Sequence, residues 1–214
     1  MLFPYKDTNP TRRFSVVTFL IIAANIFVFL YQHLSGIGYE YSTRQFALIP
    51  VELFKGNLPD STLVSPLVSS FTYMFLHGGL LHLVFNMIFL WIFGNNIEDV
   101  MTRPRFLFFY LLTGLISGLA YAVMSPNGEI PLVGASGAIS AVLGAYLFLF
   151  PWARVHVLVF IFPVQMPALI FLVLWFAAQI SGFMDGQGNV AWISHIAGFI
   201  SGVVLHRFYI VRRR

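Results

Sequence analysis

The few charged residues of this chain stand at the ends of long charge-free stretches, and this spacing is the feature that most limits its fold. Only 9% of the 214 residues are Asp, Glu, Lys or Arg, whereas 58% are hydrophobic. Soluble domains usually carry about 25% charged residues. The composition therefore disfavours a soluble globular protein and excludes a disordered chain and a nucleic-acid-binding module. Because there are no cysteines, a disulfide scaffold and a cysteine nucleophile are excluded as well.

Six apolar stretches approach the length of about 20 residues that a helix needs to cross a bilayer. The predicted spans are residues 14–31, 77–97, 106–124, 133–150, 166–182 and 190–208. The fifth belongs to a longer charge-free stretch, residues 155–184, which we expect to break near Pro163 and Pro167, since proline disrupts a helix interior. We expect the β-branched segment 155–160 to lie along the membrane interface. The sequence thus predicts an all-α polytopic membrane protein.

Basic residues divide unevenly between the two sides that six spans create. With the N-terminus in the cytoplasm, ten of the 12 Lys and Arg residues fall on the inner side, and only Arg44 and Lys55 fall outside. This excess is typical of cytoplasmic segments. It predicts that residues 1–13 and the basic tail 209–214 are both cytoplasmic. The small size and the lack of a transit signal favour a prokaryotic plasma membrane.

The basic N-terminal segment followed by an apolar run is also compatible with a signal peptide. The run has the length of a span, however, and no small-residue cleavage site follows it promptly, so we expect a retained first span. The long connection after it, about residues 32–76, is predicted to be an outer loop with its own structure or function. Its apolar part, residues 46–54, is expected to rest in the membrane interface.

The predicted spans contain no Asp, Glu, Lys or Arg near their centres. Ionisable groups at such depth are costly and usually functional, so this absence weakens the case for an ion-coupled transporter or a proton pump. It also disfavours an aspartyl intramembrane protease, which needs two Asp residues. The His-Glu-x-x-His pattern of many zinc proteases is absent too. The candidate polar chemistry is therefore that of histidine and serine.

The first motif is His-Gly-Gly at 77–79, followed by His82 and Asn86. His82 and Asn86 are four residues apart, so they share one face of a helix, and both can donate hydrogen bonds. The alternative is that they only join neighbouring helices, as polar residues in spans often do. His77 lies about 140° around the helix from His82 and is expected to serve another neighbour or the loop.

The second motif is Gly-Ala-Ser-Gly at 134–137, which opens the fourth span with Ser136 inside it. Small residues continue at Ser140, Ala141 and Gly144, and they form a stripe that lets another helix approach closely. A packing stripe with an incidental serine is the alternative.

The third motif lies in the sixth span, where His195, Gly198 and Gly202 share one helix face. The fourth and sixth spans thus both offer faces that permit close backbone contact. A serine and a histidine within hydrogen-bonding reach are the minimum for an activated serine nucleophile. The alternative is a pair of tightly packed helices with His195 bonded to a backbone carbonyl.

Together these motifs resemble those of the rhomboid family of intramembrane serine proteases. The matching patterns are His-x-x-x-Asn in the second span, Gly-x-Ser-Gly at the fourth and His-x-x-Gly-x-x-x-Gly in the sixth. The His-Gly-Gly sequence and the long first loop also fit. Order and spacing agree over about residues 14–208, so the resemblance implies a six-helix rhomboid-like bundle.

The resemblance implies a role for each matching residue. Ser136 would be the nucleophile and His195 its general base, in a dyad with no acidic third member. His82 and Asn86 would stabilise the oxyanion, with help from the backbone N–H of Ser136. Four glycines would allow the helices to pack closely at the site: Gly134, Gly137, Gly198 and Gly202. His77 would support the structure near the first loop.

The resemblance also implies the setting of the site. The substrates would be transmembrane segments of other proteins, the surroundings would be the lipid bilayer, and neither a cofactor nor a metal would be needed. Because hydrolysis requires water, the helices would enclose a cavity that opens to the outer side. In the family, the fifth span and the segment after it act as gate and cap, here residues 166–182 and 183–189.

The sequence departs from the family's pattern at two places. Ser140 stands where some members have a tyrosine that packs on the catalytic histidine, so the resemblance does not identify the group that orients His195. The Trp-Arg pair that is frequent in the first loop is absent, and residues 67–71 read Leu-Val-Ser-Ser-Phe instead. Two other classes stay open: a non-catalytic rhomboid-like binder of membrane proteins, and a small transporter or channel.

Overall fold

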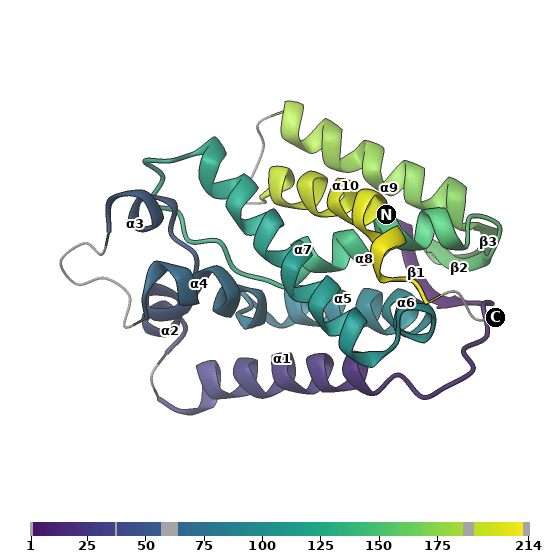
Figure 1. The fold of residues 1–214 in the computed structure, drawn as a ribbon, viewed down its shortest axis with the longest axis horizontal. Coiled ribbons are helices and arrows are strands. Elements are labelled where there is room, and N and C mark those ends of the chain that lie inside the picture. The colour runs from purple at the N-terminus through teal and green to yellow at the C-terminus, as the bar shows by residue number, and fades with distance from the viewer. Residues whose placement is uncertain (1, 37, 57–63, 186–190, 212–214) are drawn as a thin grey trace.

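The computed structural model of the chain describes residues 2–36, 38–56, 64–185 and 191–211. Helices dominate it, and one lies at each of the six predicted apolar stretches. In chain order these are α1 (Val16–Leu34), α5 (Leu80–Phe89), which continues through the π-helical turn η2 (Leu90–Gly94) into α6 (Asn95–Met101), α7 (Arg103–Met124), α8 (Ser136–Leu149), α9 (Ala168–Met184) and α10 (Trp192–Tyr209). Figure 1 shows α8 in the interior, largely behind α7 and α10.

Three helices in the described part of the chain are long and apolar enough to cross a membrane: Val16–Leu34, Leu80–Met101 and Arg103–Met124. The apolar helices α8 and α9 are shorter, with 14 and 17 residues. Large apolar side chains face outward, such as Phe27 at 70% exposed and Phe108 at 67%, and they give the bundle a surface suited to lipid. The structure is thus mostly helical with several apolar helices, while the six-span count and the domain boundaries stay predictions.

A small antiparallel sheet corrects the all-α fold class. Its strands are β1 (Leu2–Asp7), β2 (Arg154–Val159) and β3 (Phe162–Pro167), in the order β1-β2-β3. The segment 155–160, which was expected to lie along the membrane interface, therefore belongs mostly to the central strand. The predicted N-terminal segment begins with a strand as well, and Figure 1 shows this purple strand beside the β2–β3 hairpin.

The pattern of β2 explains why this segment becomes a strand. Valine recurs at every second position, and both Val155 and Val157 are fully buried on one face, as a half-buried strand requires. Pairing on both edges also satisfies its backbone groups, which would be costly to leave free in an apolar setting. β1 was not predicted because its short sequence contains Pro4 and two charged residues, and because its partner is about 150 residues away.

In its described part, the connection between α1 and α5 contains four short helices, which agrees with the expectation of a loop that has its own structure. They are α2 (Tyr39–Phe46), α3 (Pro50–Lys55), α4 (Pro66–Thr72) and η1 (Tyr73–Phe75). Much of the apolar segment 46–54 packs into the protein, since Ala47 and Leu48 have no exposed surface, whereas Phe54 is 51% exposed. Its position relative to the membrane interface stays a prediction. Leu48 also pairs with Leu132, which anchors this connection to the segment that leads into α8.

Some predicted features fall outside the described residues. They are most of the predicted cap at 183–189, the predicted first residue of the sixth span at 190, and the last three residues of the basic tail.

The backbones of α8 and α10 approach each other at three glycines. A Cβ atom on Gly198 would overlap the carbonyl oxygen of Gly137, and one on Gly202 would overlap that of Ala141. Gly144 meets the carbonyl of Phe199 in the same way from the other helix. Ten consecutive residues of α8, 137–146, are buried, so this helix is the centre of the bundle.

Asp7, the last residue of β1, ties the sheet to the helices. Its carboxylate accepts hydrogen bonds from the Tyr146 hydroxyl at 2.6 Å and from the Asn96 side-chain amide at 2.8 Å. Burial raises the pKa of this carboxyl group above its usual value, and the hydrogen bonds from Tyr146 and Asn96 only partly oppose that effect. The strand is therefore held to α8 and α6 by a carboxyl group whose ionised form is disfavoured.

The first prediction concerns the glycine contact. Gly202→Val would drive a branched side chain into the α8 backbone, which cannot move aside as a side chain can. We expect the free energy of unfolding to fall by about 1–3 kcal/mol or more, as is usual for overpacking. The measurement is thermal unfolding in detergent micelles, with Val204→Leu on the 47% exposed side of α10 as the control. Equal stability of Gly202→Val and wild type would show that the helices do not need this contact.

The second prediction concerns Asp7→Asn, whose amide oxygen can still accept from Tyr146. A carboxyl group with a raised pKa in the folded state stabilises the fold most at low pH, and this contribution is lost as the pH rises through the folded-state pKa, which lies above 3.8. We therefore expect the variant to gain stability relative to wild type as the pH rises above about 4. Thermal unfolding measured from pH 4 to 8 tests this. A difference that is constant across this range would contradict it, and Asp185→Asn at an exposed position controls for the loss of one charge.

Candidate active site

Ser136 is the first residue of α8, and the chain reaches it through Gly134. The φ angle of Gly134 is 120°, in the region that favours glycine, and a Cβ atom there would collide with the ring of His82. The Gly134 N–H donates to the carbonyl oxygen of Tyr73 at 2.9 Å, which holds the turn against the end of the first connection. The turn thus presents Ser136 at the beginning of a buried helix.

His195 lies in the first turn of α10, directly opposite Ser136. Its Nε2 atom is 2.8 Å from the Ser136 hydroxyl oxygen, which is hydrogen-bonding distance although 59 positions separate the two residues in sequence. The preceding residue, Ser194, is held by Ser117 of α7, whose hydroxyl donates to the Ser194 carbonyl at 2.7 Å. The beginning of α10 is therefore fixed by α7 on one side and by the glycine contact with α8 on the other.

The second ring nitrogen of His195 contacts a residue that sequence reasoning did not identify. Its Nδ1 atom is 2.8 Å from Oε1 of Gln179, which lies on α9. Ser140, the residue at the position of the family's tyrosine, instead donates its hydroxyl to the Ser136 carbonyl at 2.6 Å. A signal was present in the sequence, because Gln179 is an amide within a mostly apolar helix, where its side chain needs hydrogen-bond partners.

His82 and Asn86 lie on α5 and face the same space as Ser136. The Gly78 N–H donates to His82 Nδ1 at 3.4 Å, so Nε2 carries the hydrogen in the neutral ring. His82 Nε2 and the Ser136 hydroxyl oxygen lie close to the same position beside Gly134. A Cβ atom built on Gly134 would be 2.9 Å from His82 Nε2 and 3.7 Å from the Ser136 hydroxyl oxygen. The Asn86 amide nitrogen is buried and has no hydrogen-bond partner among the described residues. His82 and Asn86 thus offer two side-chain donors on the cavity that Ser136 also lines.

His77 lies behind His82 rather than in the cavity. It is fully buried, its ring centre is 5.1 Å from that of His82, and its backbone N–H donates to the side chain of Gln32 at 3.4 Å. Because Gln32 belongs to α1, this contact links the first helix to the start of α5. Such a position is compatible with the structural role that the resemblance implies.

A cavity of about 1230 Å³ joins these groups. Ser136, His195, His82, Asn86 and Gln179 all line it. Its walls come from α2, α5, α7, the segment before α8, α8 itself, α9 and the start of α10. Within the described ranges, no three His, Asp or Glu side chains are grouped closely enough to hold a metal ion.

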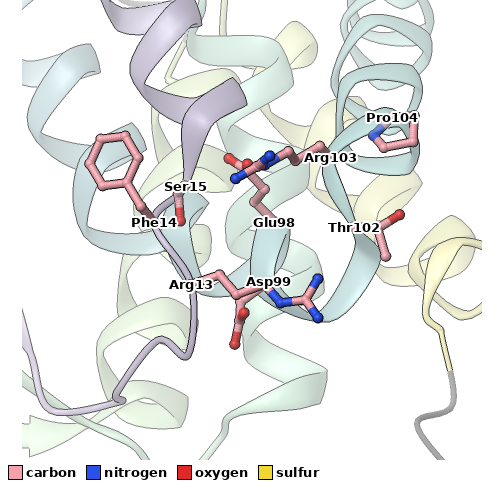
Figure 2. A pocket seen from close by; sticks show the side chains of 8 residues that line it. All are labelled: Arg13, Phe14, Ser15, Glu98, Asp99, Thr102, Arg103 and Pro104. Carbon is pink, nitrogen blue, oxygen red and sulfur yellow. The ribbon is translucent and has the colours of Figure 1, made fainter.

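A second cavity, of about 290 Å³, lies at the other end of the bundle and is shown in Figure 2. It is formed where the chain enters α1 and where α6 meets α7, and its lining residues are Arg13, Phe14, Ser15, Glu98, Asp99, Thr102, Arg103 and Pro104. Glu98 is already engaged there, because its carboxylate accepts from the backbone N–H groups of Val17 at 3.0 Å and Thr18 at 2.7 Å. It thus caps the positive end of α1, which is a structural role.

Comparison of the sequence with known proteins shows similarity to one family. A family model described as a rhomboid domain matches residues 64–212. Rhomboid protein 1, mitochondrial, of Saccharomyces cerevisiae is 31% identical over 140 residues, which are 64% of this chain and 40% of that protein. Rhomboid protease GluP of Bacillus subtilis is 32% identical over 148 residues, or 67% of this chain and 25% of GluP. Putative rhomboid protease YdcA of the same species is 37% identical over 78 residues, 36% of this chain and 39% of YdcA.

This chain spans 25% to 40% of the length of these three relatives. The matched region starts before α4 and includes every residue of the cavity's polar cluster, from His82 to His195. It leaves out β1 and α1, so the relation does not account for the N-terminal strand. The family match covers well over half of the 214 residues, and the helices carry outward-facing apolar side chains. The chain is therefore a multi-pass membrane protein and belongs to the rhomboid family.

Proposed function

We propose that this protein is an intramembrane serine endopeptidase that cleaves transmembrane segments of other membrane proteins. The observation that carries the proposal is the 2.8 Å contact between the Ser136 hydroxyl oxygen and His195 Nε2, inside a cavity bounded by apolar helices. A serine bonded to a histidine that is oriented by a third group is the usual arrangement of an activated nucleophile. Similarity to rhomboid proteases supports the same activity.

In the first step, the Ser136 hydroxyl oxygen attacks the carbonyl carbon of a peptide bond while His195 Nε2 takes the hydroxyl proton. The carbonyl oxygen becomes negatively charged, and we propose that His82 Nε2–H and the Asn86 amide donate hydrogen bonds to it. The Ser136 backbone N–H adds to them, since the first N–H groups of a helix have no partner within the helix. One such donor is worth a factor of about 10²–10³ in kcat in other serine proteases.

In the second step, the carbon–nitrogen bond breaks and His195 returns the proton to the leaving amine, which leaves an acyl ester on Ser136. A water molecule then attacks the ester with His195 again as the base, and both products are released. The peptide must be unwound at this point, because in an intact helix its carbonyl is bonded within the helix and enclosed by side chains. A cavity of about 1230 Å³ can hold several residues of such an extended segment.

The orientation in the membrane belongs to the same proposal. The uneven distribution of Lys and Arg supports cytoplasmic termini. Similarity to bacterial rhomboid proteases favours a plasma membrane. Ser136 then lies toward the outer side, where water can reach the cavity. The family's gate would correspond to α9, whose outer face is largely exposed, with side chains such as Val173 and Leu174.

The third prediction tests the nucleophile and the base. We expect Ser136→Ala and His195→Ala each to lower cleavage of a model transmembrane substrate by about 10⁶-fold, which is below detection, because the two residues act as a unit. A fluorophosphonate probe should label the wild-type protein and neither variant. Cleavage is measured with purified protein in liposomes, and labelling in detergent.

The control variants are Ser181→Ala, at an exposed position on α9, and His206→Ala, near the end of α10. Both should label and cleave as wild type does. Full cleavage by Ser136→Ala would contradict the proposed nucleophile. A wild-type protein that binds a substrate but neither labels nor cleaves would support a non-catalytic rhomboid-like binder instead.

The fourth prediction concerns Asn86. Asn86→Leu is similar in size but lacks the donor, so we expect kcat to fall by about 10²-fold or more while KM changes little, because the lost bond forms only in the transition state. Steady-state cleavage of the same substrate measures both constants. An unchanged kcat would mean that the free amide of Asn86 does not face the oxyanion.

A further inference from the structure

Gln179 is the polar side chain of α9 that reaches the Ser136–His195 pair. Only 7% of the Gln179 residue is exposed. The other buried residues of this helix are apolar. Its amide makes two hydrogen bonds: the nitrogen donates to the Trp175 carbonyl at 3.2 Å, and the oxygen lies 2.8 Å from His195 Nδ1. Both ends of the amide are therefore engaged.

These two bonds determine which way the amide points. A backbone carbonyl oxygen can only accept a hydrogen bond, so the NH₂ group of Gln179 has to face Trp175. The amide oxygen of Gln179 then faces His195, and it too can only accept. The hydrogen between them must therefore come from His195 Nδ1.

The position of that hydrogen sets the chemistry of the ring. In a neutral imidazole only one nitrogen carries a hydrogen, and the hydrogen bond made by one nitrogen decides the state of the other. With the hydrogen on Nδ1, the Nε2 atom has a free lone pair, and it is this atom that lies 2.8 Å from the Ser136 hydroxyl. The opposite tautomer would place a hydrogen on Nε2, where it could not take the serine proton.

The choice of an amide has a physical reason in this setting. A carboxylate would hold the same tautomer more strongly, but an unpaired carboxylate deep among apolar helices is expensive. The amide supplies an acceptor without a net charge. It also stabilises the imidazolium that forms when His195 takes the proton, since the Nδ1–H bond strengthens as the ring becomes positive.

We propose that Gln179 is a positioning residue that holds His195 in the Nδ1–H tautomer and aims Nε2 at Ser136. This role rests on the proposed function, in which His195 is the base. Gln179 would then be the group that orients His195, which the resemblance did not identify because Ser140 stands at the position of the family's tyrosine. It also makes α9 part of the catalytic apparatus, so the base is oriented from one helix and the nucleophile is presented by another.

The fifth prediction compares two substitutions of Gln179. Gln179→Leu removes the acceptor, and we expect kcat to fall by about 10- to 100-fold, the effect of one hydrogen bond to a group that becomes charged. KM should change by less than about threefold, because the bond matters most in the transition state. Gln179→Glu keeps an acceptor oxygen at the same distance and should retain more activity than the leucine variant. Ser181→Leu makes a comparable polar-to-apolar change at an exposed position of α9 and controls for the helix itself.

A second measurement reads the tautomer directly and does not depend on activity. Nitrogen-15 NMR of ring-labelled histidine, assigned by comparison with His195→Ala, should show the Nδ1–H form of His195 in wild type and in Ser136→Ala. In Gln179→Leu this form should give way to the Nε2–H form or to a mixture. An Nε2–H tautomer in the wild-type protein would overturn the proposed role, whatever the activity.

The outcomes separate the two proposals. If the wild type labels and cleaves and Gln179→Leu matches it in kcat, the positioning role is wrong and the proposed function stands. If the wild type neither labels nor cleaves while NMR shows the Nδ1–H form that Gln179→Leu loses, the proposed function is wrong and Gln179 still orients the ring. If Gln179→Leu does not fold, Gln179→Glu is tested in its place. The proposed role then requires that Gln179→Glu keeps both the Nδ1–H form of His195 and most of kcat.

Discussion

The contact between α8 and α10 is the constraint on which the rest of the structure depends. Apolar side chains gain little by leaving lipid for a protein interior, so helices in a membrane are held together by close packing and hydrogen bonds. At Gly198 and Gly202 the backbone of α10 touches carbonyl groups of α8, and no side chain keeps the helices apart. Only at that separation can Ser136 at the start of one helix reach His195 on the other.

The polar network around this contact extends to helices on both sides. On one side Ser117 of α7 holds the backbone of Ser194, and on the other Gln179 of α9 faces His195. Each of these bonds is made by an uncharged group in apolar surroundings, where a hydrogen bond is strong and an unmatched charge would be costly. The proposed catalytic site therefore consists of uncharged polar groups, as expected for a site among apolar helices.

The N-terminal strand connects parts of the bundle that are far apart in the sequence. β1 pairs with the hairpin that joins α8 to α9, and Asp7 binds Tyr146 near the other end of the helix that begins with Ser136. Phe3 of the same strand packs against Phe85 of α5, with 5.6 Å between ring centres. The strand thus bridges α5 and the α8–α9 connection, although it lies outside the region that matches the family.

Much of this arrangement could be predicted from local sequence. Runs of apolar residues between charges predicted a helix at each of six places, since helix formation in an apolar medium satisfies backbone groups within one segment. The spacing of Gly198 and Gly202 predicted a face for close packing, and the motifs indicated Ser136, His195, His82 and Asn86 as one site. The long-range pairing of β1 could not be predicted in this way, because β1 has no local signature and its partner strand is about 150 residues away.

The sequence by itself determined the class of environment, the places of the apolar helices and the residue types available for catalysis, because hydrophobicity and spacing are local properties. Only the tertiary structure decided how those residues meet. The partner of His195 Nδ1 comes from 16 positions away on another helix, and the strand that completes the sheet comes from the opposite end of the chain. Such pairings depend on how whole helices pack and where each side chain then points, and no pattern within a single segment carries that information.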